Sequence, residues 1–327
     1  MGNEIIKIGI LGCANIAKKS VIPAIKSLSD KFELLFIASL NPQKAKDFAT
    51  EFNCQPMAGY DALIDSNKID AVYIPLPTGL HKEWVNKAIL SGKHVYAEKS
   101  LAYSYSDATE MVEHAKNNEL ALMEGFMFLY HSQHDIVFKL LREGKIGEIR
   151  HFSSSFGFPP LDPTNFRYSE KLGGGALLDA AGYTVRSARF ILGDQFEIKG
   201  ATLFVDSSKG TNVYGSAFMT NSNGTGASLA FGFDNFYQCR YEIWGQKGKI
   251  IAERAFTPPV EFSPRIIFET QTGIQVIKAE PDNHFVHAFE EFYHIIGNKI
   301  TREKHYADIL KQSHSLDLIR HYSNITL

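Results

Sequence analysis

The chain has 327 residues, of which 44% are hydrophobic and 21% are charged, and its formal net charge is -2. Such a balance is typical of ordinary soluble globular proteins, and it gives no sign of the basic face that nucleic-acid binding needs. No apolar run reaches the ~18 residues that cross a bilayer, and the first residues lack a secretion signal, so we expect no membrane partner and a cytoplasmic location.

The first part of the chain alternates short β-branched strands with longer amphipathic helices. Near-continuous apolar strands between helices are typical of a parallel sheet covered on both faces. We therefore predict a doubly wound α/β domain of Rossmann type over residues 1–123, in a chain long enough for two domains. The expected strands are KIGILG, FELLFIAS, IDAVYIPL, HVYAEK and LALMEGF, and the expected helices are 15–29, 42–53, 80–91 and 105–118.

The pattern changes after residue 123. A helix at 132–143 and a strand at 148–157 precede a Pro-rich loop and a helix at 175–192. From 195 to 279 the chain is mainly alternating strands with Gly and Asn turns, and helices at 283–296 and 305–320 follow. This order predicts a C-terminal α+β domain over 124–327, built on a large, mainly antiparallel open sheet.

The turn after the first strand, in IGILGCANIA, has the form of a dinucleotide site. A pyrophosphate needs a sharp turn, close backbone approach and free amides at a helix N-terminus. Gly9 and Gly12 supply the turn, whereas Ala14 adds a methyl group where a second glycine is usual. Such turns also occur as plain strand-to-helix connections, but the alternating run that follows favours the cofactor. The expected cofactor-binding positions here are Gly9, Gly12, Cys13, Ala14, Asn15 and Ile16.

The end of the second strand bears on which dinucleotide is bound. An acid there would hold the ribose hydroxyls of NAD, whereas small polar residues and a cation would accept the 2′-phosphate of NADP. The chain has Ser39 and Asn41 without an acid, and Lys44 follows, so NADP is slightly favoured over NAD. Asn41 and Lys44 could equally be ordinary helix-capping residues.

Histidine pairs raise the question of a metal. His131 with His134, and His284 with His287, could each place two imidazoles on one helical face. Neither pair has a third ligand at an obvious spacing, so we expect no metal site.

Four further stretches carry a family signature: YIPLPTGLHKEWVNKAILSGKHVYAEKS, MEGFMFLYHSQH, KLGGGALLDAAGYTVRSARFILG and YEIWGQKGKIIAERAFTPP. With the first turn, they resemble the Gfo/Idh/MocA family of glucose-fructose oxidoreductases, inositol dehydrogenases and rhizopine-catabolism proteins. The resemblance spans nearly the whole chain in order. It implies an NAD(P)-dependent oxidoreductase whose C-terminal sheet serves substrate binding and a homodimer or homotetramer.

The resemblance also implies roles for residues of the first domain. Leu76, Pro77, Thr78 and His81 match the segment that passes the nicotinamide half of the cofactor, although His81 could instead form hydrogen bonds at a helix N-terminus. The family's Glu-Lys-Pro motif matches the stretch 98–100, giving Glu98 and Lys99 cofactor contacts and Lys99 a catalytic and substrate-binding role. Ser100 replaces a proline that is often cis, which leaves the local backbone open.

In the second domain, Arg167 resembles a family arginine that reaches toward cofactor or substrate. Asp179 and Tyr183 match a motif of three glycines, an aspartate and a later His or Tyr, with Asp179 either accepting a substrate hydroxyl or capping the helix. Hydride transfer to a ketone leaves negative charge on oxygen, so a proton donor and a cation lower the barrier. We hypothesise that Tyr183 donates the proton and Lys99 lowers its pKa; the alternative is a solvated lysine and a packing tyrosine.

Tyrosine in place of histidine resembles the glucose-fructose oxidoreductase, dihydrodiol dehydrogenase and sugar-nucleotide ketoreductase branches of this family. Gly-Cys-Ala in the first turn and AFTPP after the WGQKGKI strand are most similar to the NDP-hexose 3-ketoreductases. The favoured function is therefore an NDP-sugar 3-ketoreductase with a sugar or sugar-nucleotide substrate. One alternative is a dehydrogenase of a free sugar, inositol or trans-dihydrodiol. Another is a non-catalytic regulator that binds the dinucleotide.

Overall fold

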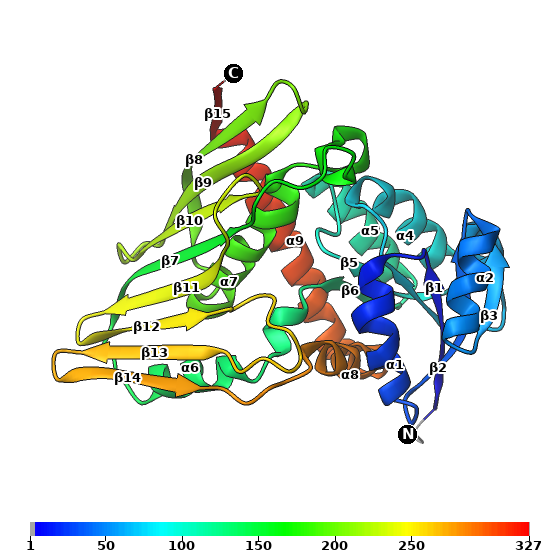
Figure 1. The fold of residues 1–327 in the computed structure, drawn as a ribbon, viewed down its shortest axis with the longest axis horizontal. Coiled ribbons are helices and arrows are strands. Elements are labelled where there is room, and N and C mark those ends of the chain that lie inside the picture. Colours follow the sequence, from blue (N-terminus) through cyan, green and yellow to red (C-terminus); the bar gives the residue numbers. More distant parts are fainter. Residues whose placement is uncertain (1–3, 327) are drawn as a thin grey trace. The chain divides into compact units, whose positions relative to one another are not determined.

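The computed structural model describes residues 4–326 and divides them into two compact units (Figure 1). The first unit comprises the chain up to Gly125 together with Phe285–Ser313. The second comprises Phe126–His284 and the chain from His314 on. The sequence analysis placed the boundary between the two domains after residue 123, close to the observed boundary after Gly125. It assigned all of 124–327 to the second domain, so it did not predict that Phe285–Ser313 belongs to the first unit.

The first unit is built on a parallel sheet whose order, within residues 4–326, is β3-β2-β1-β4-β5-β6. The order reverses between β1 and β4, which is where doubly wound sheets bind their ligands. Figure 1 shows helices beside this sheet, as the alternating pattern predicted. The strands are β1 (Ile6–Leu11), β2 (Phe32–Ser39), β3 (Gln55–Ala58), β4 (Ala71–Ile74), β5 (His94–Glu98) and β6 (Leu122–Gly125). The helices are α1 (Ile22–Ser27), which continues a π-helical segment (Ala17–Val21), α2 (Pro42–Glu51), α3 (Tyr60–Ile64), α4 (His81–Leu90) and α5 (Tyr105–Asn117).

Strand β3 and helix α3 are additions to the predicted elements. The strand QPMA is short, mostly exposed and contains a proline, as edge strands often do. It therefore carries none of the apolar pattern by which buried strands are recognised. Helix α3 buries Tyr60, Leu63 and Ile64 against the same sheet.

Helix α8 (His284–Gly297) explains why the chain returns to the first unit. Its Phe289 ring lies 5.7 Å from the ring of Phe32 on β2 and 4.8 Å from that of Tyr96 on β5. Phe292 lies 5.6 Å from Tyr96 and is also fully buried. These aromatic contacts bury a large apolar area, so α8 completes the core of the first unit. Helix α9 (Lys299–Tyr322) follows and continues from one unit into the other.

The second unit is built on a mostly antiparallel sheet of order β14-β13-β12-β11-β7-β10-β9-β8-β15, counted over the described chain. Only the pairs β7–β10 and β8–β15 in this sheet are parallel among residues 4–326. Helix α7 (Gly182–Leu192) packs on β7 and β10, and α6 (Gln133–Arg142) packs on β13. The strands are β7 (Ile149–Gly157), β8 (Glu197–Asp206), β9 (Thr211–Thr220), β10 (Gly226–Gly232), β11 (Gln238–Gly245), β12 (Gly248–Glu253), β13 (Arg265–Thr270), β14 (Gly273–Lys278) and β15 (Ser323–Thr326).

Side chains of β11 alternate between buried and accessible positions. The alternation means that one face of the sheet is covered and the other is open, as predicted. Over the described part of the chain, no helix has both the length and the apolar character needed to span a bilayer.

Candidate active site

The turn between β1 and the first helix has the geometry that the sequence predicted. Gly12 adopts φ +126°, a value that side chains rarely allow, and a Cβ there would lie 3.0 Å from Leu76 Cδ2. Its amide donates to Ala38 O at 2.9 Å, which holds the end of β1 against β2. Because it has no side chain, Gly12 permits both the sharp turn and the close approach of Leu76, which follows β4.

The residues after Gly12 fit the diphosphate of a dinucleotide. Ala14 O accepts the first helical hydrogen bond from Lys18 N at 3.1 Å, so the amides just after Ala14 form the first turn of a helix. Amides in the first turn of a helix have no intrahelical partner, so they can donate hydrogen bonds to an anion. Asn15 is exposed, and Cys13, Ala14 and Ile16 are half-buried, so the backbone of this turn is accessible.

Gly9 has a different role from the other residues of the turn. It is buried within β1, and a Cβ there would lie 2.6 Å from Leu63 Cδ1 of α3. Gly9 thus makes room for helix packing, so the structure does not support the expected direct contact between Gly9 and the cofactor.

The residues after β2 include the N-cap of helix α2 and an exposed lysine. Asn41 Oδ1 accepts from Lys44 N at 3.1 Å, and Asn41 N donates to Ser39 Oγ at 3.1 Å, so Asn41 is the N-cap of α2. Lys44 is exposed and, among the described residues, its ammonium forms no ion pair. Burial raises the pKa of the neighbouring Cys13 thiol, whose Sγ lies 3.6 Å from Lys44 O. Capping by Asn41 leaves the Lys44 ammonium accessible to a phosphate.

His81 links the loop after β4 to the loop after β5. Its Nε2 lies 2.7 Å from Leu76 O, and its Nδ1 lies 3.1 Å from both Ser100 O and Leu101 O. Burial lowers the pKa of this imidazole, which has no exposed surface. Direct contact of the His81 ring with a cofactor is therefore not supported, and the ring instead positions the backbone on either side of it.

Thr78 forms a second link between the same loops, because its Oγ1 donates to Ser100 O at 2.9 Å. Pro77 precedes this residue as the N-cap of a short 3₁₀ helix (Thr78–Leu80). The Lys99–Ser100 peptide is cis although residue 100 is not a proline. The serine thus keeps the backbone form that the family resemblance associates with proline.

Glu98 and Lys99 lie at the carboxyl end of β5. Burial raises the pKa of the Glu98 carboxyl, and the hydroxyl of Tyr73 donates to its Oε1 at 2.7 Å. This contact with β4 holds the Glu98 side chain at the carboxyl end of the sheet. Lys99 follows immediately and is half-buried in the first unit.

In the second unit, a loop folds back so that Arg167 meets Asp179. Arg167 Nε lies 2.7 Å from Asp179 Oδ2, although the two residues are twelve positions apart. Gly175 N donates to Arg167 O at 2.9 Å, and a Cβ on Gly174 would lie 2.4 Å from that oxygen. The glycine triplet is therefore required for the position of Arg167.

Tyr183 follows Asp179 at the start of α7 and lies in an aromatic enclosure. The ring centroids of Phe126, Phe156 and Phe256 lie 5.7, 4.7 and 5.7 Å from its own. The phenol donates to Met127 Sδ at 3.9 Å. Phe256 was not among the residues expected at the site, because nothing in the local pattern of AFTPP indicates its contact with α7.

Arg167 provides a positive charge near this phenol. Burial lowers the pKa of Arg167, but the Asp179 carboxylate and the nearby Tyr183 raise it by more, so the net shift is upward. Arg167 and Tyr183 are therefore close enough to interact electrostatically. The sequence hypothesis considered only Lys99 as the cation that acts on Tyr183.

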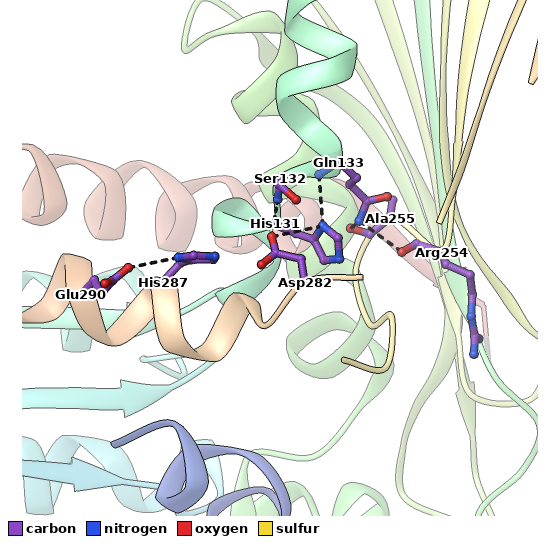
Figure 2. Close-up of polar contacts among 8 residues, drawn as sticks. All are labelled: His131, Ser132, Gln133, Arg254, Ala255, Asp282, His287 and Glu290. Carbon is purple, nitrogen blue, oxygen red and sulfur yellow. Dashed lines mark hydrogen bonds and ion pairs between the residues drawn. The ribbon is translucent and has the colours of Figure 1, made fainter. Parts of the chain in front are cut away.

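The histidines of the two sequence pairs form contacts with neighbouring residues, and Figure 2 shows one histidine of each pair, His131 and His287. His131 is buried beside Asp282, with 3.8 Å between Nδ1 and Oδ2, and Ser132 N donates to the same carboxylate oxygen at 2.8 Å. His134 Nδ1 lies 2.8 Å from the Tyr241 hydroxyl. His287 is exposed and pairs with Glu290 at 3.0 Å. Across residues 4–326, no group of three or more metal-ligating side chains is arranged around a common point.

Two family models match this chain. The model described as an oxidoreductase family with an NAD-binding Rossmann fold matches residues 6–126, and that of the GFO/IDH/MocA C-terminal domain matches residues 136–251. The chain is similar to enzymes described as dTDP-3,4-didehydro-2,6-dideoxy-alpha-D-glucose 3-reductase. It is 42% identical to the one from Saccharopolyspora spinosa, over 81% of this chain and 79% of the relative. It is 37% identical to the one from Actinomadura kijaniata, over 96% and 95%.

A solved structure is similar over almost the full length. It is KijD10, a 3-ketoreductase from Actinomadura kijaniata, in complex with NADP and TDP-benzene. The TM-score is 0.94, with 36% sequence identity over 98% of each chain. The aldose-aldose oxidoreductase from Caulobacter crescentus, at 22% identity and a TM-score of 0.85, shows the shared fold.

Proposed function

This chain belongs to the GFO/IDH/MocA family of oxidoreductases, and from that premise we propose that it reduces the 3-keto group of a nucleotide-linked deoxysugar with NADPH. The observation that carries the proposal is the similarity to KijD10 and to the dTDP-sugar 3-reductases over nearly the whole of each chain. Both sheets of the chain are covered by that similarity, so it extends to the substrate-binding half as well as the nucleotide-binding half.

NADP is the proposed cofactor. Its diphosphate would bind the amides of the turn at 12–16, and its 2′-phosphate would lie near Ser39 and Lys44. The absence of an acid at the end of β2 supports NADP over NAD, because a carboxylate there would repel the 2′-phosphate. When bound, the nicotinamide supplies the hydride.

The chain's own residues supply the remaining chemistry. We infer that Tyr183 donates a proton to the carbonyl oxygen as negative charge develops there. Lys99 is inferred to orient the substrate hydroxyls, as the family resemblance implies. Arg167 adds a positive charge from within the second unit, and Asp179 fixes its guanidinium at 2.7 Å. Asp179 is thus a positioning residue in addition to the substrate contact expected from the sequence.

A homodimer or homotetramer through the open face of the second sheet is part of the proposal. Accessible aromatic side chains lie on strands β8 and β9, where Phe204 and Tyr214 stack with 4.8 Å between ring centroids. Phe218 on β9 and Trp244 on β11 are also 45% and 59% exposed. Exposed apolar patches on a sheet commonly mark association surfaces.

The test is a titration with NADPH and NADH followed by turnover with matched substrates. We expect tighter binding of NADPH, and NADPH oxidation with a TDP-linked 3-keto-deoxysugar. The free 3-keto sugar should react much more slowly, because it lacks the nucleotide. Equal turnover of the free sugar, or oxidation of free polyols alone, would favour the dehydrogenase alternative. Tight NADPH binding without turnover of any of these compounds would favour a regulator.

A further inference from the structure

Arg254, which follows β12, lies close to two aromatic rings of the second unit. Its guanidinium carbon lies 4.7 Å from the ring centroid of Tyr237 and 5.5 Å from that of Phe262. Aromatic neighbours attract a guanidinium without using its N–H donors, which stay available for an anion. Arginine binds phosphates through these planar N–H donors.

No carboxylate neutralises this arginine within the described residues. The adjacent Glu253 pairs with Arg265 instead, at 2.6 Å. Arg254 is half-buried, and a partly desolvated cation without a counterion is unfavourable. The missing negative charge can be supplied by a ligand.

The backbone at Arg254 supports a functional role. Its φ is +57°, in the left-handed region that residues other than glycine rarely adopt outside constrained sites. Gln133 Nε2 donates to Arg254 O and Ala255 O, each at 3.5 Å, and Ala255 N donates to Cys239 O at 2.8 Å. Figure 2 shows the Arg254 carbonyl facing Gln133 while the guanidinium extends away from it. These contacts hold the backbone at Arg254 in place.

The position of Arg254 relates it to the proposed proton donor. Phe256, two residues later, packs against Tyr183 with 5.7 Å between ring centroids. Two residues of extended chain span at most ~7 Å, so the Arg254 backbone lies close to the aromatic enclosure of Tyr183. A sugar near Tyr183 would place groups attached to its anomeric carbon within reach of a long side chain in this region.

We propose that Arg254 binds the phosphoryl groups of the nucleotide-linked substrate and so selects nucleotide-linked sugars over free ones. The inference rests on the proposed function, because it assigns the substrate's diphosphate to a residue that the catalytic argument does not use. The cofactor's phosphates are a second possible source of the same chemistry. The experiment separates the two sources.

The experiment compares the full chain with its Arg254→Gln and Arg254→Lys variants by calorimetric titration with TDP, thymidine and NADPH. Loss of a charged hydrogen-bond partner should weaken TDP binding about 10- to 100-fold in Arg254→Gln. Arg254→Lys should fall between that variant and the unmodified protein, since it keeps the charge but loses the planar fork. Thymidine and NADPH affinities should stay within about two-fold, which also shows that the variants fold. Arg142→Gln, at an exposed arginine at the end of α6, is the matched control and should bind TDP normally.

Each contrary outcome has a distinct meaning. If Arg254→Gln binds TDP as tightly as the unmodified chain, the assignment of Arg254 is overturned while the proposed function stands. If NADPH affinity falls in place of TDP affinity, the arginine serves the cofactor and the inference is also overturned. If the unmodified chain binds NADPH but not TDP, the proposed substrate class fails and the inference fails with it.

Discussion

Replacing Tyr183 with phenylalanine should remove activity while leaving the fold intact. The ring is 5% exposed and its enclosure by Phe126, Phe156 and Phe256 depends on the ring alone, which phenylalanine keeps. The hydroxyl contact with Met127 is long, at 3.9 Å to sulfur, so loss of this contact by itself should cost less than the ~1 kcal/mol of an ordinary hydrogen bond. A change below ~1 kcal/mol shifts Tm by no more than about 3 °C in a chain of this size.

The catalytic effect should be much larger than the effect on stability. Removal of a general acid lowers kcat by ~100-fold or more, which corresponds to about 2.7 kcal/mol of transition-state stabilisation. The assay is NADPH oxidation at saturating substrate, with Tm measured on the same preparations. KM should change little, because the phenylalanine ring occupies the same space.

Tyr241→Phe is the matched control for this substitution. Tyr241 is a fully buried tyrosine of the same unit whose hydroxyl lies 2.8 Å from His134 Nδ1. Its replacement should cost about 1–2 kcal/mol of stability by removing the partner of His134 Nδ1, with kcat nearly unchanged. If Tyr183→Phe instead keeps kcat within a few-fold, Tyr183 is not the proton donor and the packing role is sufficient.

Three other substitutions or conditions should give measurable effects. Lys44→Glu should reduce the preference for NADPH over NADH by about 10-fold or more in binding titrations, because it replaces an accessible cation with an anion beside the 2′-phosphate. Gly174→Ala should lower the free energy of unfolding by about 1–3 kcal/mol and reduce kcat, since its Cβ would overlap Arg167 O. Burial lowers the pKa of His94 to about 4 and of His134 to about 3, so the unfolded chain binds more protons below pH 6.5. Stability in urea should therefore fall as pH decreases from 6.5 to 4, by about 1.4 kcal/mol per pH unit for each histidine once the unfolded form is protonated.

Controls for these three effects exist on the same chain. Lys46→Glu introduces the same charge change at another exposed position of α2 and should leave cofactor preference unaltered. Gly200→Ala adds a methyl group where no atom lies within 4 Å, so it should be nearly neutral. His94→Gln should reduce the slope of stability against pH. A slope unchanged by that variant would contradict the assignment of His94 to the pH effect.

The sequence predicted most of the fold because its strands and helices differ clearly in pattern. Strands such as FELLFIAS are near-continuous apolar runs, and the parallel sheet follows from their alternation with helices. Strand β3 was missed because an exposed edge strand has no such run. The return of Phe285–Ser313 was missed for another reason: an apolar helix face shows that a helix is covered, but not by which domain.

Prediction of the site was limited in the same way. Gly12, Asn41 and Tyr183 lie in local motifs whose spacing is visible in the sequence. The structure places them at a positive-φ turn, at the N-cap of α2 and in the first turn of α7, and their roles in binding and catalysis stay predictions. The ion pair of Arg167 with Asp179 depends on how a loop folds back over the glycine triplet, which no spacing rule specifies. Arg254 was missed altogether, because an arginine with aromatic neighbours is recognisable only once those neighbours are known.

The residues proposed to bind the cofactor and those proposed to act on the substrate lie in different units, so the two sets of proposals can be tested separately. The cofactor groups assigned to the turn at 12–16 and to Lys44 belong to the first unit, whereas Tyr183 and Arg254 belong to the second. Variants of the second unit should therefore leave NADPH binding measurable when turnover or TDP binding is lost. Cutting the chain at 125 would not achieve the same separation, because it removes α8, whose Phe289 packs against Phe32 in the core of the first unit. Point substitutions in the full chain are thus the means by which each unit's contribution can be measured.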